Sequence, residues 1–202
     1  IEDSIWIFSQ REYAEACVEH YREESRNFRV HVIKKERFAP FLSRAFFTNG
    51  VGGIFLDNGQ VGHFIRKEYL LNAPDYSGMD KKDIPVVNPD FMRVYLKFLQ
   101  ELGWKAKYYE RKKVLEKLEY DLIRSIRGVR FLVPTKGAPE SLKAQDIRLG
   151  ENGNVDIPML FGENGKKGLP VFTDWDQFNL MYGGDDYHAW ALDFDSVVNI
   201  LY

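Results

Sequence analysis

The densest group of potential metal ligands lies near the end of the sequence, where Asp185, Asp186 and His188 are followed by Asp193 and Asp195. A hard cation needs several oxygen atoms that converge on one point, and spacing in the sequence does not by itself bring them together. The two glycines before Asp185 are typical of a turn, and Asp193 precedes an apolar segment as a helix cap does. We therefore interpret these acids as solvated loop residues and expect no metal site and no cofactor.

Cys17 and His20 lie three residues apart on a predicted helix, and a thiol beside an imidazole is a possible nucleophile pair. Cys17 belongs to the apolar stripe of that helix, however, which favours a small buried hydrophobic residue. The sequence also has no phosphate-binding loop ending in Lys-Ser/Thr, no Gly-x-Ser-x-Gly elbow and no paired-histidine zinc motif. We predict no catalytic residue and lean against an enzyme, although the question stays open.

The stretch from Thr173 to Asp176 places a tryptophan between two acids at a predicted strand-to-helix turn. Ligands commonly bind at such turns in α/β sheets, so recognition is one interpretation. The other is structural: a hydroxyl or carboxylate that caps the helix, followed by a hydrophobic anchor. Both interpretations stay open, and we take Phe172, Thr173, Asp174 and Trp175 as candidate binding residues.

The elements that would position these residues begin with a strand-helix-strand-helix unit over residues 1–67. An apolar strand at 5–8 leads to Ser9, which with Glu12 predicts a capping box for the first helix. Alternation predicts a strand at 28–33, and apolar spacing predicts a helix at 38–46. A β-hairpin should follow, with its turn at Asp57-Asn58-Gly59.

The rest of the chain predicts a linker, a helical pair and a second unit. Residues 68–87 lack periodicity and are rich in turn formers, as a linker is. Two helices occupy 88–128, the first capped by Asn88. Residues 129–202 again predict strands and helices, with a hairpin around 162–168 and a helix that begins at Asp193. Because the sequence stops inside an apolar helical pattern, we expect this unit to be truncated at its C-terminus.

The first and second units echo each other. Residues 5–9 (IWIFS) and 169–173 (LPVFT) are both apolar strands that end in phenylalanine and are followed by a hydroxyl residue. Residues 30–33 (VHVI) correspond in the same way to 189–192 (AWAL). The echo predicts an internal duplication. The expected fold class is α/β (α+β), with two similar strand-helix-strand-helix units with mixed sheets, separated by the helical pair.

Four segments carry a resemblance to a known family: 129–134 (VRFLVP), 156–161 (DIPMLF), 191–194 (ALDF) and above all 168–175 (GLPVFTDW). They resemble the SseB (enhanced serine sensitivity protein B) family of bacterial proteins, directly over 129–202 and through the echo over 4–60. The resemblance implies a small α/β module without established catalytic residues. Gly53 to Asn58 is similar to the segment that closes the family's unit, so we add Asp57 and Asn58 to the candidate binding residues.

Charge and composition narrow the choice of partners. The sequence has 28 Lys and Arg against 30 Asp and Glu, a formal net charge of −2, which disfavours nucleic acid as a partner. One cysteine fits a reducing compartment, and no run approaches the roughly 20 apolar residues of a membrane span. We expect a cytoplasmic protein that binds another protein or itself and does not bind a membrane.

Two functions stay open at this point. The favoured one is a non-enzymatic interaction or regulatory module. The alternative is a small enzyme or ligand-binding domain that uses the acidic cluster of Asp174, Asp176, Asp185 and Asp186, and it requires at least two of these acids to converge in a pocket.

Overall fold

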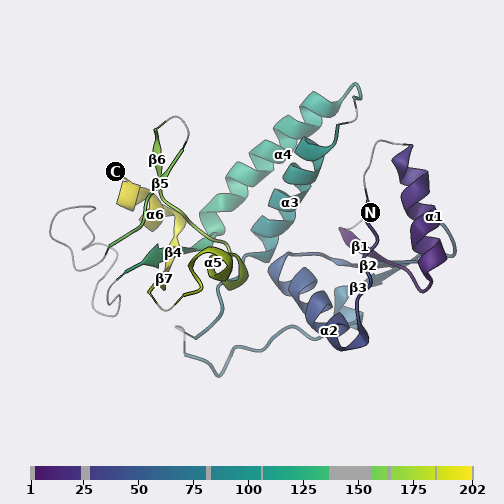
Figure 1. Ribbon diagram of the computed structural model, residues 1–202, viewed down its shortest axis with the longest axis horizontal. Coiled ribbons are helices and arrows are strands. Elements are labelled where there is room, and N and C mark those ends of the chain that lie inside the picture. The colour runs from purple at the N-terminus through teal and green to yellow at the C-terminus, as the bar shows by residue number, and fades with distance from the viewer. Residues whose placement is uncertain are drawn as a thin grey trace. The chain divides into compact units, whose positions relative to one another are not determined.

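Six α-helices and three small sheets make up the described part of the chain, so the expected α+β class is confirmed (Figure 1). The computed structural model describes residues 3–23, 28–80, 83–105, 107–136, 156–162, 165–184 and 186–201. The chain separates into two units, each described below by itself. Unit 1 comprises Ile1–Ser77 and Pro89–Arg124, and unit 2 comprises Gly78–Asn88 and Ser125–Tyr202.

A three-stranded mixed sheet forms the centre of unit 1. Strand β2 (Gly53–Leu56) lies between β1 (Ser4–Ile7), to which it is parallel, and β3 (His63–Arg66), to which it is antiparallel. The chain between β1 and β2 forms α1 (Arg11–Arg22), α2 (Lys35–Ser43) and a π-helical turn (Arg44–Thr48). A buried cluster joins the second helix and this turn to the sheet: Leu42, Ala45, Phe46 and Ile54.

The predicted hairpin is confirmed as β2 and β3. Its turn contains Asp57 and Gly59, whose φ angles are 49° and 89°. Aspartate is one of the few side chains that tolerate this left-handed region, because its short polar group can bond to nearby backbone. The local sequence was therefore sufficient to predict the turn.

The strand predicted at 28–33 is wrong. These residues form no helix or strand, and the described residues add no strand to β1 opposite β2. The ring of Phe28 packs instead against Trp6 and Tyr21, with centroid distances of 5.3 and 5.6 Å. An alternating pattern gives a strand only where a neighbouring strand pairs with it.

The predicted capping box at Ser9 and Glu12 is also wrong. Helix α1 begins at Arg11 with Gln10 as its N-cap, and no side chain caps it. The hydroxyl and the backbone amide of Ser9 both donate to the carboxylate of Asp57. A partner 48 residues away has thus replaced the local one.

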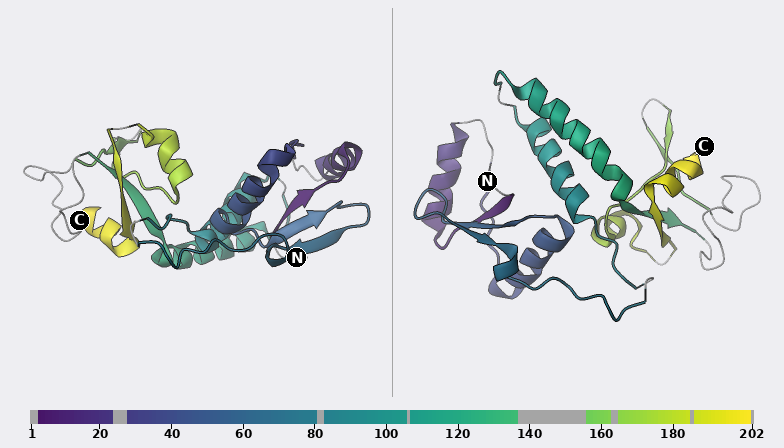
Figure 2. Two further views of the ribbon diagram at one scale, coloured as in Figure 1. Left: turned by 90° about the horizontal axis from the view of Figure 1, so that it is seen from below. Right: turned by 180° about the vertical axis from the view of Figure 1, so that it is seen from behind.

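The remainder of unit 1 is a pair of helices, α3 (Pro89–Gly103) and α4 (Arg111–Ser125). They lie side by side in every view (Figures 1 and 2). The guanidinium of Arg111 donates to the carbonyl oxygens of Glu101 and Leu102 at 3.0 and 3.2 Å, which satisfies the open end of α3. Among the described side chains of the two helices, Met92 alone is buried.

Unit 2 is organised around β4 (Arg130–Thr135). One edge of β4 pairs antiparallel with β7 (His188–Asp193) over six residues. At its other edge Leu132 exchanges two backbone hydrogen bonds with Phe172, of 2.8 and 3.0 Å. Helices α5 (Trp175–Tyr182) and α6 (Phe194–Leu201) follow, and β5 (Leu160–Phe161) and β6 (Lys167–Gly168) form a separate small hairpin.

The core of unit 2 draws on the stretch 68–87 that the sequence predicted as a linker. Val86 is buried in one cluster with Leu132, Phe178 and Tyr182. The end of this stretch therefore contributes to packing as well as to connection. The domain boundaries predicted at 67, 87 and 128 remain a proposal.

The duplication also remains a prediction. Both units run in the order strand, helix, extended segment, helix, but β1 pairs in parallel along its length, whereas Phe172 forms a single antiparallel bridge. Residues 28–33 form no strand, whereas their predicted counterpart lies within β7.

Candidate functional site

The Phe172–Trp175 turn joins the edge of the unit 2 sheet to α5. Phe172 is fixed by its two backbone bonds to Leu132, and its ring meets those of Phe178 and Tyr182 edge-on, each at a centroid distance of 5.6 Å. The ring of Phe172 therefore belongs to the core of unit 2.

Asp174 is a buried helix cap. Its Oδ1 accepts a hydrogen bond from the backbone amide of Gln177 at 3.0 Å, and its Oδ2 accepts one from the hydroxyl of Thr173 at 3.0 Å. Because both carboxylate oxygens are engaged, the geometry supports the structural interpretation for Thr173 and Asp174. The predicted cap of α5 is confirmed.

Asn88 fixes the turn from outside it. Its side-chain amide donates to the carbonyl oxygens of Arg130 and Thr173 at 2.8 and 2.7 Å, and its Oδ1 accepts from the amide of Arg130 at 3.0 Å. The sequence predicted that Asn88 caps a helix, but its side chain is committed to β4 and to the turn. No local signal could have shown this, because its partners lie 42 and 85 residues away.

Trp175 opens α5, and 41% of its surface is exposed. The next turns of the helix leave Leu180 and Met181 exposed to 80% and 54%. Phe178 and Tyr182 lie four residues apart on the face that packs into unit 2, and Leu180 lies two residues from each, on the opposite face. The sequence reasoning named Trp175 and missed Leu180 and Met181, although two large apolar residues outside the stripe of Phe178 and Tyr182 could have indicated them.

Asp57 and Asn58 lie in unit 1, at the turn between β2 and β3. The carboxylate of Asp57 accepts from the amide and the hydroxyl of Ser9, at 2.7 and 2.8 Å. Asn58 donates to the sulfur of Cys17 at 3.9 Å. Burial raises the pKa of the Cys17 thiol, and the Asn58 contact partly offsets that rise. Both side chains thus tie the hairpin to the start and the inner face of α1.

The acids of the alternative hypothesis have separate surroundings. Asp174 is a buried cap, whereas Asp176 and Asp186 are exposed, and Asp185 lies outside the described residues. Asp193 accepts from the backbone amide of Ser196 at 2.8 Å, and hydrogen bonds from Ser196 lower the pKa of its carboxyl. Among the described residues, no three His, Cys, Asp or Glu side chains are placed to hold a metal ion.

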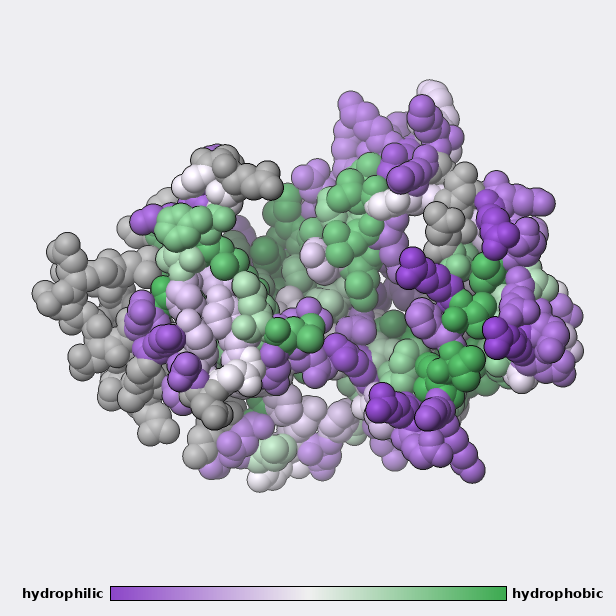
Figure 3. Space-filling model, in the orientation of Figure 1, coloured by the Kyte–Doolittle hydropathy of each residue, from purple (hydrophilic) through white to green (hydrophobic). Residues whose placement is uncertain are grey.

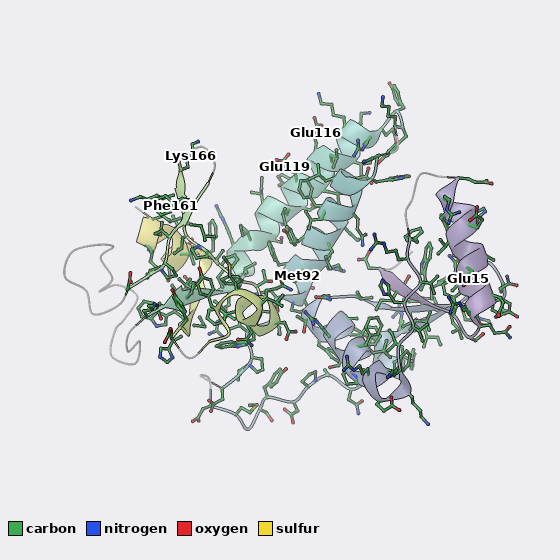
Figure 4. All side chains as sticks on the ribbon, viewed as in Figure 1. Glu15, Met92, Glu116, Glu119, Phe161 and Lys166 are labelled. Carbon is green, nitrogen blue, oxygen red and sulfur yellow. The ribbon has the colours of Figure 1, made fainter. Side chains whose placement is uncertain are left out.

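Charges of both signs alternate along α4. Glu116 and Glu119 project from this helix (Figure 4), and Glu116 lies 3.8 Å from the ammonium of Lys112. Interleaved acids reduce the positive field that a nucleic-acid backbone requires.

A cavity of about 1430 Å³ opens in unit 1, between β1, residues 28–33 and the end of α3. Its lining is mostly apolar on the β1 side, with Ile5 and Ile7, and carries cations on the α3 side, with Lys97 and Lys105. None of the candidate binding residues predicted from the sequence lines it.

Comparison with known proteins finds a similarity for the second half of the chain alone. No curated protein and no solved structure matches the chain. None of the helices within the described ranges is both long enough and apolar enough to cross a membrane. Residues 112–201 match the model of the SseB protein N-terminal domain, which confirms the resemblance inferred from the sequence over 129–202. This part of the chain, which contains the Phe172–Trp175 turn and α5, is similar to the SseB protein N-terminal domain.

Proposed function

We propose that this SseB-type chain is a non-enzymatic module that binds another protein through the outward face of α5. The observation that carries the proposal is that α5 exposes two large apolar side chains, Leu180 and Met181, beside the polar residues of its outward side. Its inner face packs Phe178 and Tyr182, and its outer face exposes Leu180 and Met181. Large apolar side chains exposed next to each other are typical of a surface that a partner covers.

The surface of unit 2 supports this proposal. Figure 3 shows hydrophobic residues at the surface over α5. Trp175, at the first turn, adds an aromatic side chain of the type that is enriched in protein interfaces. Single exposed hydrophobic residues are common, but three on an eight-residue helix are a concentration of the kind that marks an interaction site.

The engagement of Asp174 also favours binding over catalysis. A catalytic acid needs an oxygen that can reach a substrate, and both oxygens of Asp174 accept hydrogen bonds from the chain itself. The acidic side chain best placed at the strand-to-helix turn therefore acts on the protein's own backbone. The proposal includes a cytoplasmic, bacterial setting, supported by the single cysteine and by the SseB match.

The test compares proteins captured from the source cell by the tagged chain and by two variants. In the first variant, L180D/M181D places two charges on α5 at side chains that are exposed to 80% and 54%. In the control variant, V61D places one such charge at a valine of unit 1 that is exposed to 75%. Exposed substitutions should change the free energy of unfolding by only about 0.5 kcal/mol, which a urea titration checks.

We expect the wild-type chain and V61D to retain a shared partner that quantitative mass spectrometry identifies. L180D/M181D should retain about tenfold less of it, as expected when apolar anchors of an interface are removed. If L180D/M181D and V61D retain the same proteins in the same amounts, α5 is not the binding surface. If a small molecule is turned over by the purified chain and the D174N variant abolishes this, the non-enzymatic proposal is wrong.

A further inference from the structure

A strand that is present in the sheet of unit 2 has no counterpart among the described residues of unit 1. In unit 2, β4 lies between Phe172 on one side and β7 on the other, and it pairs with both. In unit 1 the elements follow in the same order, with β1, then α1, then residues 28–33, then α2. Among the described residues, no strand lies between β1 and 28–33, at the position that β4 occupies in unit 2.

Within the described ranges, no backbone hydrogen bond is made along the edge of β1 that faces this position. The carbonyl oxygens of Asp3 and Ile7 accept from the amides of Gly52 and Asp57, each at 2.9 Å, so these residues turn toward β2. Because successive residues of a strand direct their backbone groups to opposite sides, Ser4 and Trp6 present theirs to the other edge. No strand of the described chain pairs there, and an edge of this kind is a template for another strand.

Residues 28–33 form the opposite wall of the same space. Their sequence, FRVHVI, alternates as a strand does, and the packing of Phe28 on Trp6 holds one end beside β1. Val32 is exposed to 81%, although valine favours a paired and half-buried strand. The cavity of about 1430 Å³ is lined by β1 and by this segment, so two strand-like walls face a common space.

The charges around the cavity indicate which kind of segment could bind in it. Four cations from three parts of unit 1 line it: Arg11, Arg29, Lys97 and Lys105. Arg11 is ion-paired with Glu15 at 2.7 Å and Lys97 with Asp3 at 3.0 Å, so Arg29 and Lys105 are the two that can meet an added carboxylate. Among the described residues of the lining Glu101 is the one acid, and it already accepts from the hydroxyl of Tyr108 at 2.7 Å and lies 3.7 Å from the guanidinium of Arg111. The lining therefore complements a segment that carries carboxylates beside an apolar run.

We propose that unit 1 binds an extended, apolar segment of a partner protein, flanked by acidic residues, which inserts between β1 and residues 28–33 and pairs with the open edge of β1. The inserted strand takes the position that β4 holds in unit 2 and runs antiparallel to β1, as β4 does to Phe172. Main-chain hydrogen bonds supply the affinity of such strand addition, and alternate side chains supply the specificity. This surface lies in the other unit from α5 and does not depend on the function proposed for that helix.

The probe is a synthetic peptide that copies Val129–Thr135, with Arg130→Glu, an acetylated N-terminus and a free C-terminal carboxylate. One control peptide is N-methylated at the positions of Phe131 and Leu132, which removes backbone donors and leaves the side chains unchanged. A second control keeps Arg130. Each is titrated against the full 202-residue chain while amide hydrogen exchange is followed residue by residue.

We expect the probe to slow exchange at Trp6 and at residues 28–33, and the N-methylated peptide to have no such effect. The control that keeps Arg130 should bind about tenfold more weakly, and the difference should shrink as salt is raised. The variant V32D should weaken binding of the probe by about tenfold, whereas V61D, the same change at an equally exposed valine outside the cavity, should leave it unchanged.

The proposal is overturned if the amide of Trp6 already exchanges slowly in the chain alone, because the edge is then closed without a partner. It is equally overturned if saturating probe changes no amide of β1, or if V32D and V61D bind the probe alike. Sedimentation that shows a dimer sensitive to V32D assigns the edge to a second copy of the chain and contradicts the proposed partner.

Discussion

The carboxylate of Asp57 accepts two hydrogen bonds from Ser9, one from its backbone amide at 2.7 Å and one from its hydroxyl at 2.8 Å. This pair joins the residue that follows β2 to Ser9, two residues before α1, although 48 positions separate them. It closes the carboxyl end of the two parallel strands, because the amide of Asp57 also donates to the carbonyl oxygen of Ile7.

Substitution of Asp57 should separate its two contributions. Asp57→Gly removes both side-chain bonds and keeps a residue that adopts a φ of 49° without strain, so it should lower the free energy of unfolding by about 1–2 kcal/mol. Asp57→Ala should cost about 1 kcal/mol more, because alanine is strained in the left-handed region. Urea titrations of the wild type and both variants measure their free energies of unfolding, which should decrease in the order wild type, Asp57→Gly, Asp57→Ala. Equal stability of Asp57→Gly and the wild type would show that the bonds to Ser9 contribute nothing.

Asn88 should be more sensitive than any exposed asparagine. Asn88→Ala leaves the backbone groups of Arg130 and Thr173 without their side-chain partner in a buried place, and it should cost about 2–3 kcal/mol. Asn88→Asp should cost at least as much at neutral pH, since a carboxylate cannot donate to two carbonyl oxygens.

The control for Asn88 is Asn199→Ala, on the exposed side of α6, which should change the free energy of unfolding by no more than about 0.5 kcal/mol. Chemical denaturation measures all three variants. A loss for Asn88→Ala as small as that of the control would refute the role assigned to the side-chain amide.

The cap at Asp193 should make stability depend on pH. Hydrogen bonds from Ser196 lower the pKa of the Asp193 carboxyl in the folded state. Its stabilising contribution is therefore fully present above the ordinary aspartate pKa of about 3.9 and is lost as the pH falls through the lower folded value. An NMR titration of the Asp193 carboxyl measures the shift.

The matched variant for this titration is Ser196→Ala, which removes the side-chain hydrogen bond and keeps the backbone one. It should bring the pKa of Asp193 back toward its ordinary value. An identical titration curve in both proteins would show that the hydroxyl of Ser196 does not hold the carboxylate.

The thiol of Cys17 should react slowly in the folded protein. Its side chain is buried and burial raises its pKa, so both access and the thiolate fraction are low. Reaction with a disulfide reagent near pH 8 should be about tenfold or more slower in buffer than in urea. The chain has one cysteine, so Cys17→Ser gives the blank. Equal rates in the two conditions would contradict the buried position.

What the sequence could predict here depends on how far apart the interacting residues are. The caps at Asp174 and Asp193 and the turn at Asp57 act within three or four residues, and all three were predicted. The role of Asn88 depends on Arg130 and Thr173, far along the chain, and was missed for that reason.

The strand predicted at 28–33 failed for a related reason. The alternation of FRVHVI is a preference for pairing, and the described chain provides no neighbouring strand that meets it. In the candidate site, too, local features could be predicted and features that depend on packing could not. Asp174 could be assigned from local chemistry, whereas the exposure of Leu180 and Met181 depends on how α5 packs in unit 2.

The most direct test of the proposed function is site-specific photo-crosslinking from α5 inside the source cell. A photoreactive phenylalanine analogue replaces Leu180 in one chain and Val61 in another, since both side chains are largely exposed. Binding through α5 predicts a discrete adduct of one partner from position 180 and none from position 61. No adduct from position 180, or the same adducts from both positions, would contradict the claim that the outward face of α5 binds a protein.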